Sequence, residues 1–501
     1  MKAKLDALKH QLMISNDLES AAALLFWDQS TYMPPGGATA RARQSALLSR
    51  MAHETFVDPQ VGKLLDELRP YEESLPYDSD DASLIRVARR EYERKTQVPA
   101  DLVAETTSHF YALHGIWAEA RPKNDFAAVQ PHLEKTLELS KRWAECFPDH
   151  DHIADPLIST WDYGMKAESI RQIFSELREA LVPLVQAIRN KADIDDSCLE
   201  GYFPEALQQD FGLRVIKDFG YDFERGRQDK TAHPYMIKFS LGDVRITTRF
   251  NEARLSDALF STLHESGHAM YEQGINPAYE GTPLAGGTSA GVHESQSRLW
   301  ENIVGRSRGF WEHYYPILRD TFPEQLQGVD VESFYRAINK VKPSLIRVEA
   351  DEVTYNLHVM IRFDLELQML EGKLAIRDLP EAWNARYTSD LGVTPSSNQN
   401  GCMQDVHWFD SFIGGAFQGY TLGNIMSAQF YEAALEAHPS LPEDIRYGQF
   451  DTLRGWLTEH IYQHGSKYTA PELIERVTGK PLMIAPYIRY LQQKYGELYS
   501  L

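Results

Sequence analysis

Residues 255–274 read LSDALFSTLHESGHAMYEQG and contain the motif H-E-x-x-H, formed by His264, Glu265 and His268. Apolar residues recur through this stretch at helical spacing, which predicts an α-helix. Residues four apart lie on one face of a helix, so both imidazoles can reach one metal ion from the same side. Glu265 follows the first histidine directly and can hold a water molecule at the metal. Zinc peptidases use this arrangement to hydrolyse amide bonds.

The expected helix has clear ends and one unfavourable residue. Ser256 is the expected N-cap and Gly274 the expected C-terminal stop. Gly267 costs about 1 kcal/mol in a helix interior, and we expect it to allow close packing beside the metal. The alternative is an exposed amphipathic helix with two unrelated histidines.

A catalytic zinc site needs a third protein ligand and an open position for water. Glu294 lies at the start of a second expected helix, residues 293–302, after the glycine-rich connection 284–291. Glu301, two turns later, is the competing candidate. Alone, Glu294 would read as a surface pair with Arg298 at i,i+4 spacing. Next to H-E-x-x-H, we expect Glu294 to be the ligand.

The composition is ordinary for a globular protein, with 501 residues of which 43% are apolar and 25% are charged. The net charge of −21 comes from 51 basic and 72 acidic residues. It argues against nucleic acid or an anionic membrane as a partner. Three scattered cysteines predict no disulfide framework. No apolar run could span a bilayer, and the N-terminus lacks a signal-peptide pattern. We expect a cytoplasmic protein.

Most of the chain has helical periodicity, and no stretch resembles a flexible linker. We therefore expect one domain, residues 1–501. Besides the motif helix, the clearest expected helices are 2–26, 39–54, 81–95, 98–121, 126–146 and 167–192.

Residues 233–250 break this pattern and predict a β-hairpin, because they are rich in β-branched and aromatic residues around a turn. In the second strand, Asp243 and Arg245 share one face, and Val244 and Ile246 share the other. The hairpin ends just before the motif helix, so an edge strand could pair with an extended peptide.

Six motifs give the chain a resemblance to the carboxypeptidase Taq family of metallocarboxypeptidases. They extend over nearly the whole chain together with similar blocks near Trp27 and Tyr420. Only the first departs from the family pattern, with Tyr235 where the family usually has Phe. The motifs are His233-Pro234-Tyr235; Asp243-Val-Arg245-Ile-Thr247; H-E-x-x-H; His293-Glu294-Ser295-Gln296; Ile346-Arg347-Val-Glu-Ala350-Asp351; and Gly401-Cys-Met-Gln404-Asp405-Val-His407-Trp408.

The resemblance implies a mainly α, saddle-like subunit with a deep groove and a small β-sheet beside the metal site. Within the single domain, residues 1–70 would form an N-terminal helical part that covers the groove. It implies a homodimer and one Zn²⁺ per subunit, with Co²⁺ as the alternative. It also implies removal of single residues, with broad specificity, from peptides that have a free C-terminus.

The expected catalytic groups surround a metal on His264, His268 and Glu294. Glu265 would take a proton from the attacking water and pass it to the departing amine. By resemblance to related zinc-peptidase sites, His407 and Tyr420 are the expected donors to the oxyanion. The alternatives are a buried structural His407 against Trp408, and core packing for Tyr420.

Arg245 and Arg347 are the expected substrate-binding residues, because a guanidinium can bind both oxygens of a free carboxylate. The alternatives are internal ion pairs, Arg245 with Asp243 and Arg347 with Asp351, one helical turn away. Further support is expected from His233, Gln404 and Asp405, which would orient a ligand histidine.

Two other functions compete with a carboxypeptidase. One is an oligoendopeptidase that acts on short peptides. The other is an inactive helical scaffold, but a structural metal site would need no Glu265 and would usually have four protein ligands.

Overall fold

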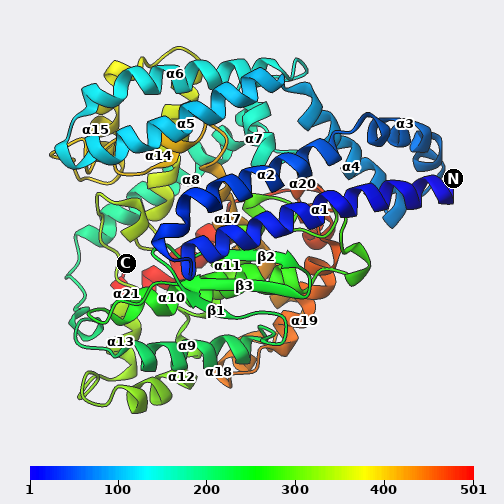
Figure 1. Ribbon diagram of the computed structural model, residues 1–501. Coiled ribbons are helices and arrows are strands. Elements are labelled where there is room, and N and C mark those ends of the chain that lie inside the picture. Colours follow the sequence, from blue (N-terminus) through cyan, green and yellow to red (C-terminus); the bar gives the residue numbers. More distant parts are fainter.

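The computed structural model describes residues 1–501, and it is mainly α-helical with one small sheet (Figure 1). The helices before the sheet are α1 Lys2–Thr31, α2 Ala38–Phe56, α3 Pro59–Ser74, α4 Asp80–Gln97, α5 Ala100–Ala120, α6 Phe126–Glu145, α7 Asp155–Trp161, α8 Ala167–Arg189 and α9 Glu205–Phe219. Those after it are α10 Leu255–Gln273, α11 Ala290–Arg298, α12 Arg308–Thr321, α13 Val331–Ile338, α14 Tyr355–Leu370, α15 Leu379–Asp390, α16 His407–Asp410, α17 Gln418–Ala437, α18 Leu441–Arg446, α19 Asp451–His460, α20 Ala470–Thr478 and α21 Ala485–Tyr499.

Two expected helix ends were wrong. Helix α1 does not stop at residue 26 but runs to Thr31, because the chain meets no helix breaker before Pro34 and Pro35. Helix α10 begins one residue before Ser256, with extended Arg254 as its N-cap, so Ser256 does not cap it. The C-terminal stop at Gly274 is confirmed.

The sheet has three strands in the order β1-β3-β2. The predicted hairpin is confirmed as antiparallel β2 (Met236–Ser240) and β3 (Asp243–Thr248). Strand β1 (Gln228–Lys230), which pairs in parallel with β3, was not predicted. Val244 and Ile246 are fully buried. The sheet packs on α10, and α1 packs against β2 (Figure 1).

Two apolar cores stabilise these layers. The larger core runs through most of the chain and includes residues of α10, α11 and α17. A smaller core joins α1, α3 and α4 through residues such as Leu8, Leu65 and Ile85. It also contains Tyr279 and Leu284, from the connection between α10 and α11. The N-terminal helices therefore pack directly against the segment that leads into α11. None of the helices combines the length and apolarity needed to cross a bilayer.

Candidate metal centre and active site

Helices α10 and α11 touch where the metal motif requires them to. A Cβ atom added at Gly267 would lie 2.6 Å from the carbonyl oxygen of Gln296 and 2.7 Å from Cα of Ser297. Any larger residue would therefore separate the two helices. Gly267 lies between His264 and His268, so this close approach brings α11 to the face that presents both imidazoles.

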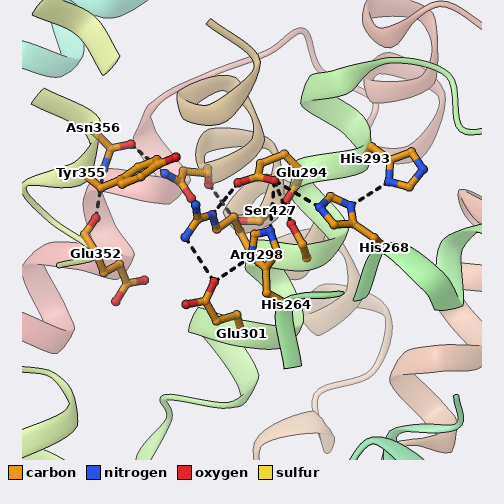
Figure 2. A network of polar contacts seen from close by, with 12 residues as sticks. His264, His268, His293, Glu294, Arg298, Glu301, Glu352, Tyr355, Asn356 and Ser427 are labelled. Carbon is orange, nitrogen blue, oxygen red and sulfur yellow. Dashed lines mark hydrogen bonds and ion pairs between the residues drawn. The ribbon is translucent and has the colours of Figure 1, made fainter. Parts of the chain in front are cut away.

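Glu294, on α11, faces both histidines of α10 (Figure 2). Its Oε2 atom lies 3.5 Å from Nε2 of His264 and 3.4 Å from Nε2 of His268. The three potential ligand atoms all lie within 4.8 Å of one another. Two imidazole nitrogens and one carboxylate oxygen are the donor set of many catalytic zinc sites. The structure thus brings together the three residues predicted as metal ligands.

Glu301, the competing candidate, contacts the other side of His264. Its Oε2 atom accepts a hydrogen bond from Nδ1 of His264 at 2.9 Å. It lies on η5 (Leu299–Val304), a π-helical turn that continues α11. Arg298 links the two carboxylates, donating to Glu294 at 2.7 Å and to Glu301 at 3.2 Å. Glu301 therefore orients the ring of His264, a candidate ligand.

His268 is held differently, by His293 of α11. The two Nδ1 atoms lie 2.8 Å apart (Figure 2). Nε2 of His293 lies 2.7 Å from Oε1 of Glu272. The sequence patterns indicated no role for the side chains of His293 and Glu272. The available signal was their position, directly before Glu294 and one helical turn after His268.

The electrostatics of the three candidate ligands and Glu265 suit a cation. Burial opposes a charge on His264, but Glu294 and Glu301 outweigh it and raise its pKa to about 10. Burial lowers the pKa of His268 to about 4, so this ring is neutral and offers a lone pair. Burial also raises the pKa of Glu265 to about 7. These side chains fit a divalent cation, which would replace a proton between His264 and Glu294.

A second polar cluster centres on Asp405. Its carboxylate accepts hydrogen bonds from Nε of Arg347 at 2.6 Å and from Nδ1 of His407 at 3.0 Å. Nε2 of His407 lies 3.3 Å from the hydroxyl of Tyr420. Burial raises the pKa of Tyr420, and Glu294 is among the charges that contribute. The structure thus places Arg347, His407 and Tyr420 in one cluster, within electrostatic reach of Glu294.

The support role expected of His233, Gln404 and Asp405 was wrong. Gln404 accepts a hydrogen bond from the backbone N–H of Arg347 at 2.9 Å, and Asp405 binds Arg347 and His407. His233 contacts neither ligand histidine; burial and then the charge of Arg347 lower its pKa. Glu301 contacts the ring of His264 instead, and His293 contacts the ring of His268.

The expected alternative of an Arg347–Asp351 pair was also wrong. Residues Arg347–Glu349 form a single 3₁₀ turn and Ala350 is extended, so helical i,i+4 spacing does not apply. Asp351 instead accepts a hydrogen bond from the hydroxyl of Thr354 at 2.6 Å, at the start of α14.

Arg245 occupies a different environment from Arg347. Its guanidinium donates to both carboxylate oxygens of Asp243, at 2.8 and 2.7 Å. It stacks on Trp27 at 4.3 Å and on Phe239 at 4.9 Å. The ion pair considered as the alternative for Arg245 is therefore present, on the face of the sheet that α1 covers.

A mainly helical protein whose H-E-x-x-H helix meets a glutamate from the next helix belongs to the class of helical metallopeptidases. A family model described as carboxypeptidase Taq (M32) metallopeptidase matches residues 7–495. The chain belongs to this family. It is a metal-dependent carboxypeptidase, and the oligoendopeptidase alternative is not supported.

Relatives and solved structures agree with this assignment. Thermostable carboxypeptidase 1 of Thermus thermophilus is 42% identical over 96% of each chain, and carboxypeptidase 1 of Bacillus subtilis is 36% identical over 96% of each. The crystal structure of an M32 carboxypeptidase from Deinococcus radiodurans is 50% identical, covers 100% of both chains and has a TM-score of 0.97. The expected mainly α fold with a small sheet is confirmed.

Proposed function

We propose that His264, His268 and Glu294 hold one Zn²⁺ per subunit, with Co²⁺ as the alternative ion. The observation that carries this proposal is the approach of one Glu294 oxygen to both Nε2 atoms, at 3.5 and 3.4 Å. The nitrogen-rich donor set favours zinc or cobalt over magnesium or calcium, which prefer oxygen ligands.

Glu265 is the proposed general base. When bound, the metal activates the attacking water and polarises the scissile carbonyl. Glu265 takes the proton of this water and delivers it to the departing amine. Glu265 is only 7% exposed and follows His264 directly, and its carboxylate accepts no hydrogen bond from the protein. It is therefore free to exchange a proton with substrate.

His407 and Tyr420 are the proposed donors to the oxyanion that forms at the scissile carbonyl. Asp405 accepts a hydrogen bond from Nδ1 of His407, which fixes the orientation of the ring. The hydroxyl of Tyr420, 3.3 Å from Nε2 of His407, is positioned by that contact.

Arg347 is the proposed anchor for the free carboxylate of the peptide. Its Nε donates a hydrogen bond to the carboxylate of Asp405, and its Nη1 donates to the hydroxyl of Tyr355 at 2.9 Å. Its Nη2 makes only a 3.4 Å contact with Asp405 and keeps donor capacity for a substrate. Arg245 is the second candidate, but Asp243 already binds its planar fork on the sheet.

The remaining proposals concern the whole chain. We propose one domain in which residues 1–70 cover the groove, supported by the contacts of Phe26 with Tyr235 and of Trp27 with Phe239. We also propose a cytoplasmic homodimer with broad specificity for peptides that have a free C-terminus. Three free cysteines and no disulfide suit a reducing compartment.

The proposed function is tested by metal analysis of the purified protein together with amino acid release from matched peptides. One peptide has a free C-terminus and the other is amidated. We expect about one zinc or cobalt ion per chain and release of single residues from the free peptide only. Magnesium alone in the active protein would contradict the proposed metal. Equal cleavage of the amidated peptide would contradict carboxylate recognition.

A further inference from the structure

The two candidate ligand histidines are supported by chemically different groups. The Nδ1 atom of His264 meets the carboxylate of Glu301 directly. The Nδ1 atom of His268 meets another imidazole, His293, whose far nitrogen meets Glu272. A carboxylate can only accept a hydrogen bond, whereas a neutral imidazole accepts at one nitrogen and donates at the other. In the hydrogen-bonded series His268–His293–Glu272, the imidazole contact alone therefore does not decide which nitrogen carries the hydrogen. The group at the far end, Glu272, must decide it.

Glu272 ends this series of hydrogen bonds, and its carboxylate is held in place by several partners. It is 4% exposed, and its carboxylate is bound by Nζ of Lys238 at 2.6 Å and by the backbone N–H of Gly287 at 2.9 Å. Burial opposes its charge, but Lys238 and His293 lower its pKa to about 2. Glu272 thus accepts hydrogen bonds from all its partners and has no proton to donate.

Because Glu272 only accepts, the positions of the hydrogens on His293 and His268 can be assigned in turn. Nε2 of His293 donates its hydrogen to the Glu272 carboxylate at 2.7 Å, which leaves Nδ1 of the same ring as the acceptor of its contact with His268. Nδ1 of His268 then donates across the 2.8 Å contact. Nε2 of His268 is left with a lone pair, and it faces Glu294.

We propose that His293 and Glu272 are positioning residues that hold His268 in the tautomer able to bind the metal. This inference rests on the proposed ligand role of His268. A group that fixes the tautomer and orientation of a metal-binding histidine typically changes metal affinity by about 10- to 100-fold.

The packing around His293 supports a fixed ring. A Cβ atom added at Gly287 would lie 2.5 Å from Cδ2 of His293 and 2.8 Å from the ring of Tyr271. Gly287 has no left-handed backbone conformation that would itself demand glycine. Gly287→Ala therefore displaces the imidazole without removing any donor or acceptor.

The test measures Zn²⁺ affinity of metal-free protein by competition with a chelator, with circular dichroism and the melting temperature of the metal-free form to establish folding. His293→Phe keeps a ring but removes the acceptor, and we expect it to weaken affinity by about 100-fold. His293→Asn can place an amide oxygen near the former Nδ1 position and should bind more tightly than the Phe variant. A similar loss on both substitutions would contradict the proposed acceptor role.

Two further variants test the chain beyond His293. Glu272→Gln can turn an N–H group toward His293, which would reverse the direction of the hydrogen bonds between Glu272 and His268. We expect this variant to bind Zn²⁺ about 10-fold more weakly, or weaker still. Gly287→Ala should also weaken binding. The matched control is Gly455→Ala on α19, where an added Cβ meets no atom within 4 Å, and its affinity should equal that of the wild type.

The outcomes separate this inference from the proposed function. If the folded Glu272, His293 and Gly287 variants bound Zn²⁺ as tightly as the wild type, the positioning role of His293 and Glu272 would be overturned. The proposed metal site would remain intact. Failure of the wild-type protein itself to bind Zn²⁺ or Co²⁺ would overturn the proposed metal site, and with it the positioning role of His293 and Glu272.

Discussion

At the residue scale, Glu265 offers the sharpest test of the proposed chemistry. Glu265→Gln keeps the shape of the side chain and leaves His264, His268 and Glu294 unchanged. We expect the variant to retain the metal and to lose kcat by about 100- to 10,000-fold, because general base catalysis contributes that much. Steady-state kinetics together with metal analysis check this result. Near-wild-type turnover would show that another group takes the proton.

The two arginines can be separated by the same pair of free and amidated peptides. We expect Arg347→Ala to raise KM for the free peptide by about 100-fold, since a charged hydrogen bond contributes about 1.5 to 3 kcal/mol. Binding of the amidated peptide, measured as inhibition, should change little. Arg245→Ala, which frees Asp243 on the sheet, should affect both peptides alike and lower the melting temperature. The reverse pattern would make Arg245 the anchor.

The sequence placed Glu294 and Glu301 on nearly the same helical face, because seven residues are close to two turns. It could not decide which one binds the metal and which one supports a ligand. The structure separates them by atom: Glu294 faces Nε2 of His264, and Glu301 faces Nδ1. Likewise, the amino-acid sequence could not show that Arg347 lies in a 3₁₀ turn instead of an α-helix, so that Asp351 is not its partner.

At the element scale, periodicity predicted α10 and the hairpin because each buries one regular face. It did not predict β1, whose three residues pair with β3 and carry no local pattern. Nor did it predict the π-helical turn η5, where the backbone leaves the regular helical spacing just as Glu301 reaches His264. Such turns are frequent at functional sites.

Helices α11 and α17 are held together by a contact that a single methyl group would disturb. A Cβ atom added at Gly423 would lie 2.6 Å from both Cβ and Cγ of Glu294. We expect Gly423→Ala to destabilise the fold by about 1 to 3 kcal/mol, as overpacking does, and to weaken metal binding because Glu294 must move. Thermal unfolding and zinc titration measure the two effects. Gly496→Ala on α21, with no atom within 4 Å, should be neutral or stabilising.

At the scale of the whole molecule, Glu371 joins segments that are distant in sequence. It follows α14 and forms ion pairs with Arg171 of α8 and with Lys373 and His152, the last two at 2.6 and 3.0 Å. Burial opposes its charge, but hydrogen bonds from Lys373, Arg171 and His152 outweigh it and lower its pKa from 4.5 to about 2. The ionised form is therefore favoured in the folded chain.

This pKa shift predicts how stability depends on pH. Because the folded-state pKa lies below 4.5, the stabilisation is complete above about pH 4.5 and is lost as the pH falls toward 2. We expect Glu371→Gln to be less stable by about 1 kcal/mol at neutral pH, since ion pairs with solvent access contribute little more. The difference from wild type should shrink as the pH falls below about 4.5. Urea unfolding at several pH values measures it, with exposed Glu436→Gln as the control. A difference that does not change with pH would mean that the charge of Glu371 contributes nothing.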